Sequence, residues 1–290
     1  MVIMSKANAF VRLIRPVNCA MMGFAVIVGV ALAEKAILFQ QPHSLLLGFV
    51  TGFLLTGAAM AINDYYDRKI DAINEPERPI PSGAVSPNGA LVFASFLTFI
   101  GLTAALLTGL SPNWQCFAIA FVSWVIVILY VTKGKSTGFP GNLLVSACVA
   151  VPFVYGGFVV GKGFLMTTGL FVAMVFLSNT GREITKGIVD VQGDKEANIR
   201  TIAVLYGERK AAAIAAMFYL SAVSITPLPW ILGIVSFWFL PFIFWTDMGL
   251  ILTSIRLLSN PSRENARRIK NRNLFWFLSG LLAFIAGSPG

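Results

Sequence analysis

Long apolar segments are the feature that most restricts how this chain can fold. A helix needs about 20 apolar residues to cross the hydrocarbon core of a bilayer. Segments of about that length lie at 17–33, 44–63, 89–110, 113–131, 142–161, 164–181, 209–227, 230–257 and 273–288. Of the 290 residues, 57% are hydrophobic and only 12% are charged, which excludes an ordinary soluble globular domain. The sequence therefore predicts one all-α domain over residues 1–290, a polytopic membrane bundle of about nine transmembrane helices.

The eighth segment, 230–257, is longer than one span requires and contains Pro241. Proline removes a backbone hydrogen bond inside a helix, and a long apolar helix tilts to fit the bilayer. We therefore expect a kinked or strongly tilted helix there.

The placement of charge predicts the orientation of these helices, because cytoplasmic loops of membrane proteins collect Lys and Arg. With a cytoplasmic N-terminus, all 22 basic residues except Lys35 and Lys162 fall on the cytoplasmic side or at its helix ends. Of 13 carboxylates, only Glu34 and Asp247 lie away from that side. We expect a multi-pass cell-membrane protein with its N-terminus and polar loops cytoplasmic and its C-terminus outside. The net charge of +9 fits this bias and also a polyanionic substrate.

An acidic segment, "NDYYDRKID", follows the second apolar run. On a helix Asp64, Asp67 and Asp71 are spaced i, i+3, i+7 and share one stripe, with Asn63 four residues before Asp67. Three carboxylates at this spacing repel one another unless a metal ion or basic neighbours neutralise them.

A second acidic segment, "GREITKGIVDVQGD", closes the sixth apolar run. Glu183, Asp190 and Asp194 again share a helix face, and Lys186 stands four residues before Asp190. The second and sixth spans run in the same direction in the predicted topology. We therefore expect both acidic segments at the same membrane face, opposite each other across a cleft.

Basic residues are interleaved with these carboxylates, and they are Arg68, Lys69, Arg78, Arg182, Lys186 and Arg200. Magnesium binds through a few carboxylates together with substrate phosphates, and Lys and Arg bind the remaining phosphate oxygens. The mixture therefore predicts a Mg²⁺-bridged diphosphate at the membrane surface with its apolar tail inside the bundle, as in an isoprenyl diphosphate.

Other basic residues near the predicted site leave two interpretations open. Lys133 and Lys135 follow the fourth span, and Arg12 and Arg15 precede the first, with Asn18 as a nearby polar group. They are either ordinary cytoplasmic charges or further substrate phosphate ligands. The basic run "SRENARRIKNR" before the last span is interpreted as a solvated loop that touches lipid headgroups.

The two segments together resemble the motifs of the UbiA superfamily of intramembrane prenyltransferases, N-D-x-x-D-x-x-x-D and D-x-x-x-D. The resemblance covers nearly the whole chain. It implies a helical bundle around a central cavity open toward the lipid, in which two Mg²⁺ ions hold an isoprenyl diphosphate. By this resemblance the first metal and diphosphate site consists of Asn63, Asp64, Asp67 and Asp71, and the second of Asp190 and Asp194.

Within the superfamily, "NEPERPIPSG" is similar to the branch that holds the geranylgeranylglyceryl phosphate geranylgeranyltransferases and the chlorophyll synthases, and the second acidic segment is more similar to the former. That resemblance implies transfer of a geranylgeranyl group to the glycerol hydroxyl of a lipid-like glycerol phosphate acceptor, with release of pyrophosphate. An ether forms, as in archaeal-type membrane lipids. A chlorophyll-synthase-like enzyme or an aromatic prenyltransferase of a quinone pathway is the alternative.

The candidate catalytic residues are Asp67, Asp71, Asp190 and Asp194, with Glu183 as the base for the acceptor hydroxyl or as a group that positions the acceptor. An ion-coupled transporter is the alternative from another class, because carboxylates within membranes mark ion paths. It predicts charges near the bilayer midplane, whereas here the carboxylates cluster at one membrane interface. No nucleic-acid partner is expected.

Overall fold

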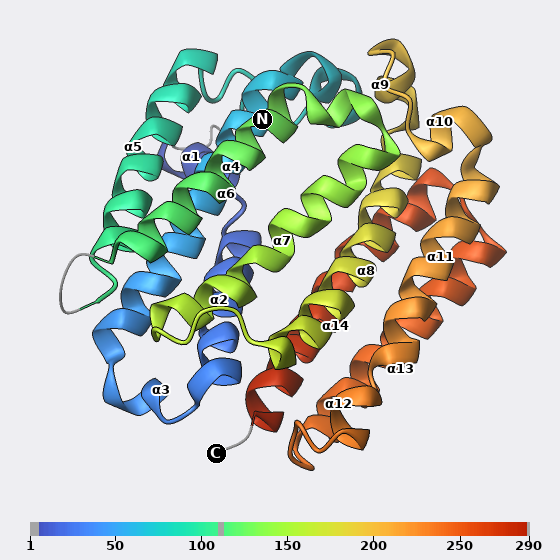
Figure 1. Ribbon diagram of the computed structural model, residues 1–290. Coiled ribbons are helices and arrows are strands. Elements are labelled where there is room, and N and C mark those ends of the chain that lie inside the picture. Colours follow the sequence, from blue (N-terminus) through green and yellow to red (C-terminus); the bar gives the residue numbers. More distant parts are fainter. Residues whose placement is uncertain (1–5, 110–112, 289–290) are drawn as a thin grey trace.

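The computed structural model describes residues 6–109 and 113–288, and all regular structure in those ranges is helical (Figure 1). The long helices are α2 (Pro16–Glu34), α4 (Pro42–Asn74), α5 (Pro87–Leu106), α6 (Trp114–Thr132), α7 (Phe139–Val159), α8 (Met166–Val189), α11 (Glu208–Ile225), α13 (Phe239–Ser259) and α14 (Arg263–Gly287). The short ones are α1 (Lys6–Ile14), α3 (Ile37–Gln40), the 3₁₀ turn η1 (Gly134–Thr137), α9 (Val191–Glu196), α10 (Ile202–Tyr206) and α12 (Leu228–Ile231). The predicted all-α class is confirmed.

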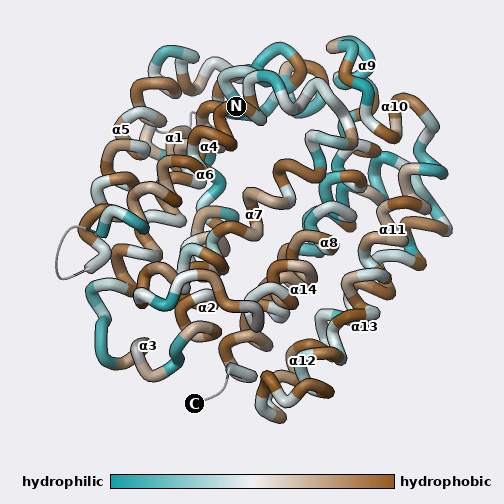
Figure 2. Tube along the Cα trace, viewed as in Figure 1, coloured by the Kyte–Doolittle hydropathy of each residue, from teal (hydrophilic) through white to brown (hydrophobic). Residues whose placement is uncertain are grey.

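Within the described part of the chain, seven helical segments are long and apolar enough to cross a membrane. They are α2, α4, α5, α6, α7, α11 together with α12, and α13. Helices α8 and α14 are also long, but charged side chains such as Arg182, Lys186 and Lys270 lower their mean hydropathy. Figure 2 shows hydrophobic residues along most of the helix lengths and hydrophilic residues gathered around α9 and α3.

The long helices begin where proline or a polar cap predicts a start. Pro16, Pro42 and Pro87 occupy the first positions of α2, α4 and α5, where the missing N–H costs nothing. Ser86 caps α5 and Ser262 caps α14, each accepting a hydrogen bond from a backbone N–H in the first turn.

The predicted kink at Pro241 is wrong. Residues 230–257 do not form one helix, because α12 ends at Ile231 and α13 begins only at Phe239. Pro241 therefore lies in the first turn of α13, where proline is tolerated. Pro152 does lie inside a helix, α7, and it lines the pocket described below.

Neighbouring helices close a ring. Each helix contacts the next in the order α2, α4, α6, α7, α8, α11, α13 and α14, and α14 in turn contacts α2. Helices α2 and α7 also cross closely, since a Cβ on Gly29 would collide with the Phe153 carbonyl and one on Gly156 with the backbone of α2. Membrane helices use such small residues to bring backbones together.

A buried polar network joins the helices of the C-terminal half. The Tyr219 hydroxyl of α11 accepts a hydrogen bond from Asn273 of α14 at 2.8 Å and lies 3.0 Å from the Thr185 hydroxyl of α8. Thr253 of α13 donates to Asn273 at 2.9 Å. In an apolar surrounding these paired groups favour one alignment of the four helices, because a shift would leave them unsatisfied.

Candidate active site

The main pocket has a volume of about 420 Å³ and lies between α2, α4, α6, α7, α8 and α14. Most of its wall is apolar and comes from residues such as Val26, Leu55, Val149 and Phe277. Its polar and charged lining includes Arg15, Asn18, Asn63, Arg78, Arg182, Glu183, Lys186, Lys270 and Asn271. These lie at or just before the start of α2, near or beyond the end of α4, near the end of α8 and in the first half of α14. They therefore meet at one end of the bundle, and the pocket is polar at that end and apolar beyond it.

The first acidic segment is buried on one stripe of α4, as its spacing predicts. Asp64, Asp67 and Asp71 are each at most 4% exposed. Arg15 donates to Asp64 at 2.5 Å, and Asn63 donates to Asp67 at 2.8 Å. Buried carboxylates are stable only with such partners.

Arg78 joins two of these carboxylates. It lies in the turn after α4, and its guanidinium is 2.5 Å from Asp71 and 3.5 Å from Asp64. Burial alone would lower the pKa of Arg78, but Asp71 and Asp64 raise the pKa by more, so it stands above the ordinary value. The guanidinium therefore stays charged and holds the turn "NEPERPIPSG" against the acidic stripe.

The second acidic segment continues from α8 into α9. Asp190 is half-buried at the junction of the two helices, and Asp194 is buried at 4% exposure in α9. Asn74, the last residue of α4, donates to the Asp190 carbonyl at 3.3 Å and accepts from the Gly193 N–H at 3.2 Å. The two acidic segments thus meet at the same end of the bundle, as we expected from the topology.

Glu183 faces the pocket from α8 between two cations. Its carboxylate lies 3.4 Å from Arg182 and 3.6 Å from Lys186, and both of these residues also line the pocket. Glu183 therefore lies at the polar end of the pocket, and its role as base or as a group that positions the acceptor stays a prediction.

Several predicted basic residues lie apart from the pocket lining. Arg68 turns back to the Tyr65 carbonyl at 2.7 Å and stacks on the Tyr65 ring. Lys133 and Arg200 are exposed, and exposed Arg12 donates to the Glu77 carbonyl at 3.4 Å. The side chain of Lys135 lies outside what the structure describes. Of Arg12, Arg15 and Lys133, the three left open above whose side chains the structure describes, only Arg15 lines the pocket.

The interpretation of "SRENARRIKNR" as a solvated loop is wrong. Helix α14 begins at Arg263, so most of this run is helical and packs on the site. Arg263 donates to the carbonyls of Val189 and Asn74, and Arg267 donates to Asn74 and pairs with Glu75 at 3.0 Å. Lys270 lines the pocket. The sequence carried a signal for this: Ser262 precedes a run that reads as a capped helix rather than a loop.

The donor set at this end fits magnesium bound together with a diphosphate. Within residues 6–109 and 113–288, no three His, Cys, Asp or Glu side chains converge to hold a metal ion by themselves. Magnesium does not need such a cage, since it usually takes one or two carboxylates, several waters and substrate phosphate oxygens. Buried Asp67 and Asp194, one on each acidic segment, are hard oxygen donors of the required kind.

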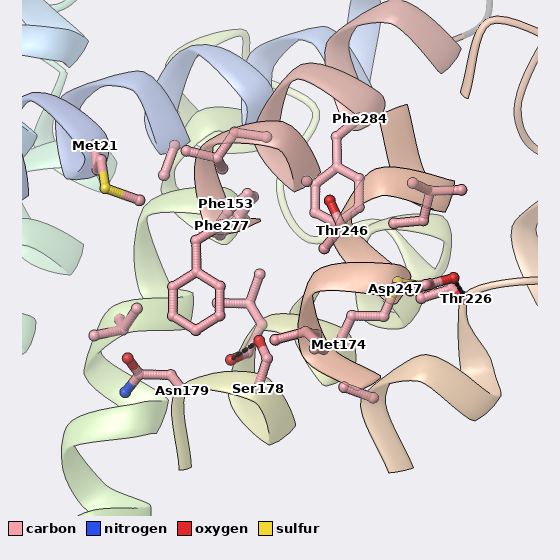
Figure 3. Close-up of a pocket in the computed structure, with 18 of the residues that line it drawn as sticks. Met21, Phe153, Met174, Ser178, Asn179, Thr226, Thr246, Asp247, Phe277 and Phe284 are labelled. Carbon is pink, nitrogen blue, oxygen red and sulfur yellow. Dashed lines mark hydrogen bonds between the residues drawn. The ribbon is translucent and has the colours of Figure 1, made fainter. Parts of the chain in front are cut away.

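A smaller pocket of about 90 Å³ adjoins the main one and shares Met21, Asn179 and Phe277 with it (Figure 3). Its lining is mostly apolar, and Asp247 of α13 accepts a hydrogen bond from Thr226 at 2.7 Å on one side of it (Figure 3). None of the predicted site residues whose side chains the structure describes lines this smaller pocket.

Fold and site together define a class of protein: a membrane-type helical bundle around a pocket with a cationic end and an apolar wall. Residues 22–279 match the model of the UbiA prenyltransferase family. The chain belongs to this family.

Relatives of the chain carry a more specific name. A Natronomonas pharaonis protein named digeranylgeranylglyceryl phosphate synthase is 37% identical over 263 residues, which cover 91% of this chain and 92% of that protein. A solved structure concerned with digeranylgeranylglyceryl phosphate synthase in membranes is 32% identical, with a TM-score of 0.69, and covers 98% of this chain and 99% of that one. A UbiA homolog from Archaeoglobus fulgidus bound to GPP and Mg²⁺ shares the fold at 15% identity, with a TM-score of 0.64 and coverage of 94% and 99%.

Proposed function

We propose that this chain transfers a geranylgeranyl group from geranylgeranyl diphosphate to the glycerol hydroxyl of geranylgeranylglyceryl phosphate, in the presence of Mg²⁺. The observation that carries the proposal is the main pocket, whose charged end includes Asn63 of the first acidic segment and Glu183 of the second and whose apolar wall suits a prenyl chain. The choice of acceptor is supported by the relatives named digeranylgeranylglyceryl phosphate synthase, which match over most of the chain.

We propose that Asn63, Asp64, Asp67 and Asp71 on one side, and Asp190 and Asp194 on the other, hold the metal ions. When bound, Mg²⁺ would neutralise the charge that builds up on the leaving diphosphate. Arg15 and Arg78 already neutralise Asp64 and Asp71, and they line the pocket beside these carboxylates. Their guanidinium N–H groups are available donors for diphosphate oxygens.

The residues of the chain have three tasks in the reaction. Arg15 and Arg78 stabilise the diphosphate as the C1–O bond of the donor breaks and the electron pair leaves with it. The apolar wall excludes water from the allylic cation, so that the glycerol hydroxyl captures C1. Glu183 takes the hydroxyl proton, because it is the carboxylate that lines the pocket between Arg182 and Lys186.

For the membrane arrangement we propose nine spans, with α8 and α14 added to the seven apolar segments, around a central cavity open toward the lipid. The N-terminus and the polar end of the pocket then face the cytoplasm. Support comes from the distribution of basic residues and from the meeting of both acidic segments at one end of the bundle.

A panel of acceptors tests the proposed function. Purified protein in detergent is incubated with geranylgeranyl diphosphate, Mg²⁺ and one acceptor, either geranylgeranylglyceryl phosphate, chlorophyllide, hydroxybenzoate or dihydroxynaphthoate. We expect pyrophosphate release and a diether product with the glycerol phosphate alone. Preferential turnover of an aromatic acceptor or of chlorophyllide would overturn the acceptor assignment and leave family membership in place.

A further inference from the structure

We infer that Lys270 of α14, together with Arg182 and Lys186 of α8, forms a second anion site that binds the monophosphate of the acceptor. This inference rests on the proposed function. The reaction brings two anionic groups into one pocket, the diphosphate of the donor and the phosphate of the acceptor. Two such groups in one cavity require two sets of cationic ligands.

The first set of cationic ligands forms ion pairs with the carboxylates on the acidic stripe of α4. Among the side chains that the structure describes, five basic ones line the main pocket, and they are Arg15, Arg78, Arg182, Lys186 and Lys270. Arg15 pairs with Asp64, and Arg78 pairs with Asp64 and Asp71. These two arginines therefore belong to the side of the pocket where the metal-bound diphosphate is proposed to lie.

The other three basic side chains, Arg182 and Lys186 of α8 and Lys270 of α14, face the pocket near a single lining carboxylate, that of Glu183. Glu183 contacts both Arg182 and Lys186. Lys270 has no ion-pair partner among the residues that the structure describes. Its ammonium group is attracted by Asp190 and Glu75 and repelled by Lys186 and Arg182. An anion between them would relieve this repulsion.

Arg182 supplies an independent observation, a buried donor that a bound anion would satisfy. Its Nε is buried and has no hydrogen-bond acceptor in the described part of the chain. A buried donor of a charged group without an acceptor destabilises the protein, because the group has lost its hydration without gaining a partner. A phosphate oxygen is the acceptor that arginine binds best.

The order of residues along α14 matches a phosphate followed by a chain. Lys270, Leu274 and Phe277 all line the main pocket and lie about one helical turn apart, so they follow one stripe from its charged end to its apolar wall. An acceptor with its phosphate at Lys270 would extend its prenyl chain past Leu274 and Phe277. Its glycerol would then lie near Glu183, which the proposed function requires.

The residues inferred here to bind the acceptor phosphate differ from the further phosphate ligands that the sequence analysis considered. Arg12 and Lys133 are exposed and lie outside the pocket lining, and the side chain of Lys135 is not described. Lys270 comes instead from the segment that the sequence analysis interpreted as a loop.

The test removes the charge from the protein and the phosphate from the acceptor in all combinations. Kinetics are measured for wild type, Lys270→Gln, Lys270→Arg and Arg182→Gln with two acceptors, geranylgeranylglyceryl phosphate and geranylgeranylglycerol, which lacks the phosphate. Arg268→Gln is the matched control, because Arg268 lies on the same helix, is exposed and pairs with Glu264. Thermal unfolding of each variant shows whether it is folded.

With the phosphorylated acceptor we expect Lys270→Gln to raise the acceptor KM about ten- to hundredfold, the loss expected for one charge-assisted hydrogen bond. The donor KM stays the same, Lys270→Arg recovers most of the affinity, and Arg268→Gln behaves as wild type. With geranylgeranylglycerol, Lys270→Gln and wild type should differ little, because the partner of Lys270 is absent from both.

Three results would overturn the inference. An equal loss with both acceptors would mean that Lys270 supports the fold, and a raised donor KM would mean that it binds the diphosphate. If Lys270→Gln does not fold, the same comparison with Arg182→Gln decides. Wild-type turnover of a different acceptor, with none of the glycerol phosphate, would instead overturn the proposed function itself.

Discussion

The side chain of Asn74 accepts a hydrogen bond from the backbone N–H of Gly193 at 3.2 Å and thereby joins the end of α4 to α9. Its amide N–H₂ donates to the Asp190 carbonyl, so one side chain aligns the two acidic segments. A Cβ on Gly193 would collide with the Asn74 amide. Residue 193 in "DVQGD" is therefore glycine because the Asn74 side chain leaves no room for a Cβ.

Breaking this contact should separate the two acidic segments. We expect Asn74→Ala and Gly193→Ala each to lower stability by about 1–3 kcal/mol, the loss of two hydrogen bonds, and to lower kcat/KM for prenyl transfer by at least tenfold. Thermal unfolding in detergent and steady-state kinetics measure the two effects. Gly187→Ala is the matched control, since a Cβ there meets only ordinary contacts with Thr201. If Gly193→Ala is as active as Gly187→Ala, the contact does not align the site.

Activity should require both acidic segments and a divalent cation. Asp67→Asn and Asp194→Asn each remove one buried carboxylate, and we expect pyrophosphate release to fall about a hundredfold or more, as when one preorganised electrostatic group is lost. EDTA should abolish release, and added Mg²⁺ should restore it. Glu264→Gln, on an exposed carboxylate of α14, should change nothing. Full turnover in EDTA or in either aspartate variant would contradict a two-segment metal site.

The buried network around Tyr219 should contribute to stability. Tyr219→Phe removes one hydroxyl and leaves the amide of Asn273 and the hydroxyl of Thr185 without their partner. We expect a loss of about 1–3 kcal/mol and a lower apparent Tm in detergent. The control is Tyr206→Phe on α10, where the ring is exposed. Equal melting temperatures for the two variants would show that the network is not stabilising.

Thiol labelling in intact cells tests the orientation. In a background without Cys19, Cys116 and Cys148, single cysteines are introduced at Ser82, Ser136 or Gln40, all of which are exposed. An impermeant reagent added outside should label the cysteine at Gln40, at the end of α3, and reach the other two only after permeabilisation. The reverse pattern would place the polar end of the pocket outside the cell.

The sequence alone was sufficient for the all-α class, for the approximate positions of the long helices and for the pairing of two acidic segments at one end. These properties follow from local periodicity and composition, because a bilayer requires apolar helices of a set length and the spacing of Asp64, Asp67 and Asp71 determines their shared face. It also placed Arg78 with the first acidic segment and Glu183 and Lys186 with the second, and it left the role of Arg15 open.

Only the tertiary structure decided which basic residues reach the pocket. Arg68 and Lys186 are both basic residues of the acidic segments, yet Arg68 folds back on Tyr65 while Lys186 lines the pocket. Lys270, 76 to 88 residues after Asp194 and Arg182 in the chain, is brought beside α8 because Tyr219, Thr185 and Asn273 hold α14 against α8. Such contacts depend on how helices distant in the sequence pack together, and neither periodicity nor charge along one segment contains that information.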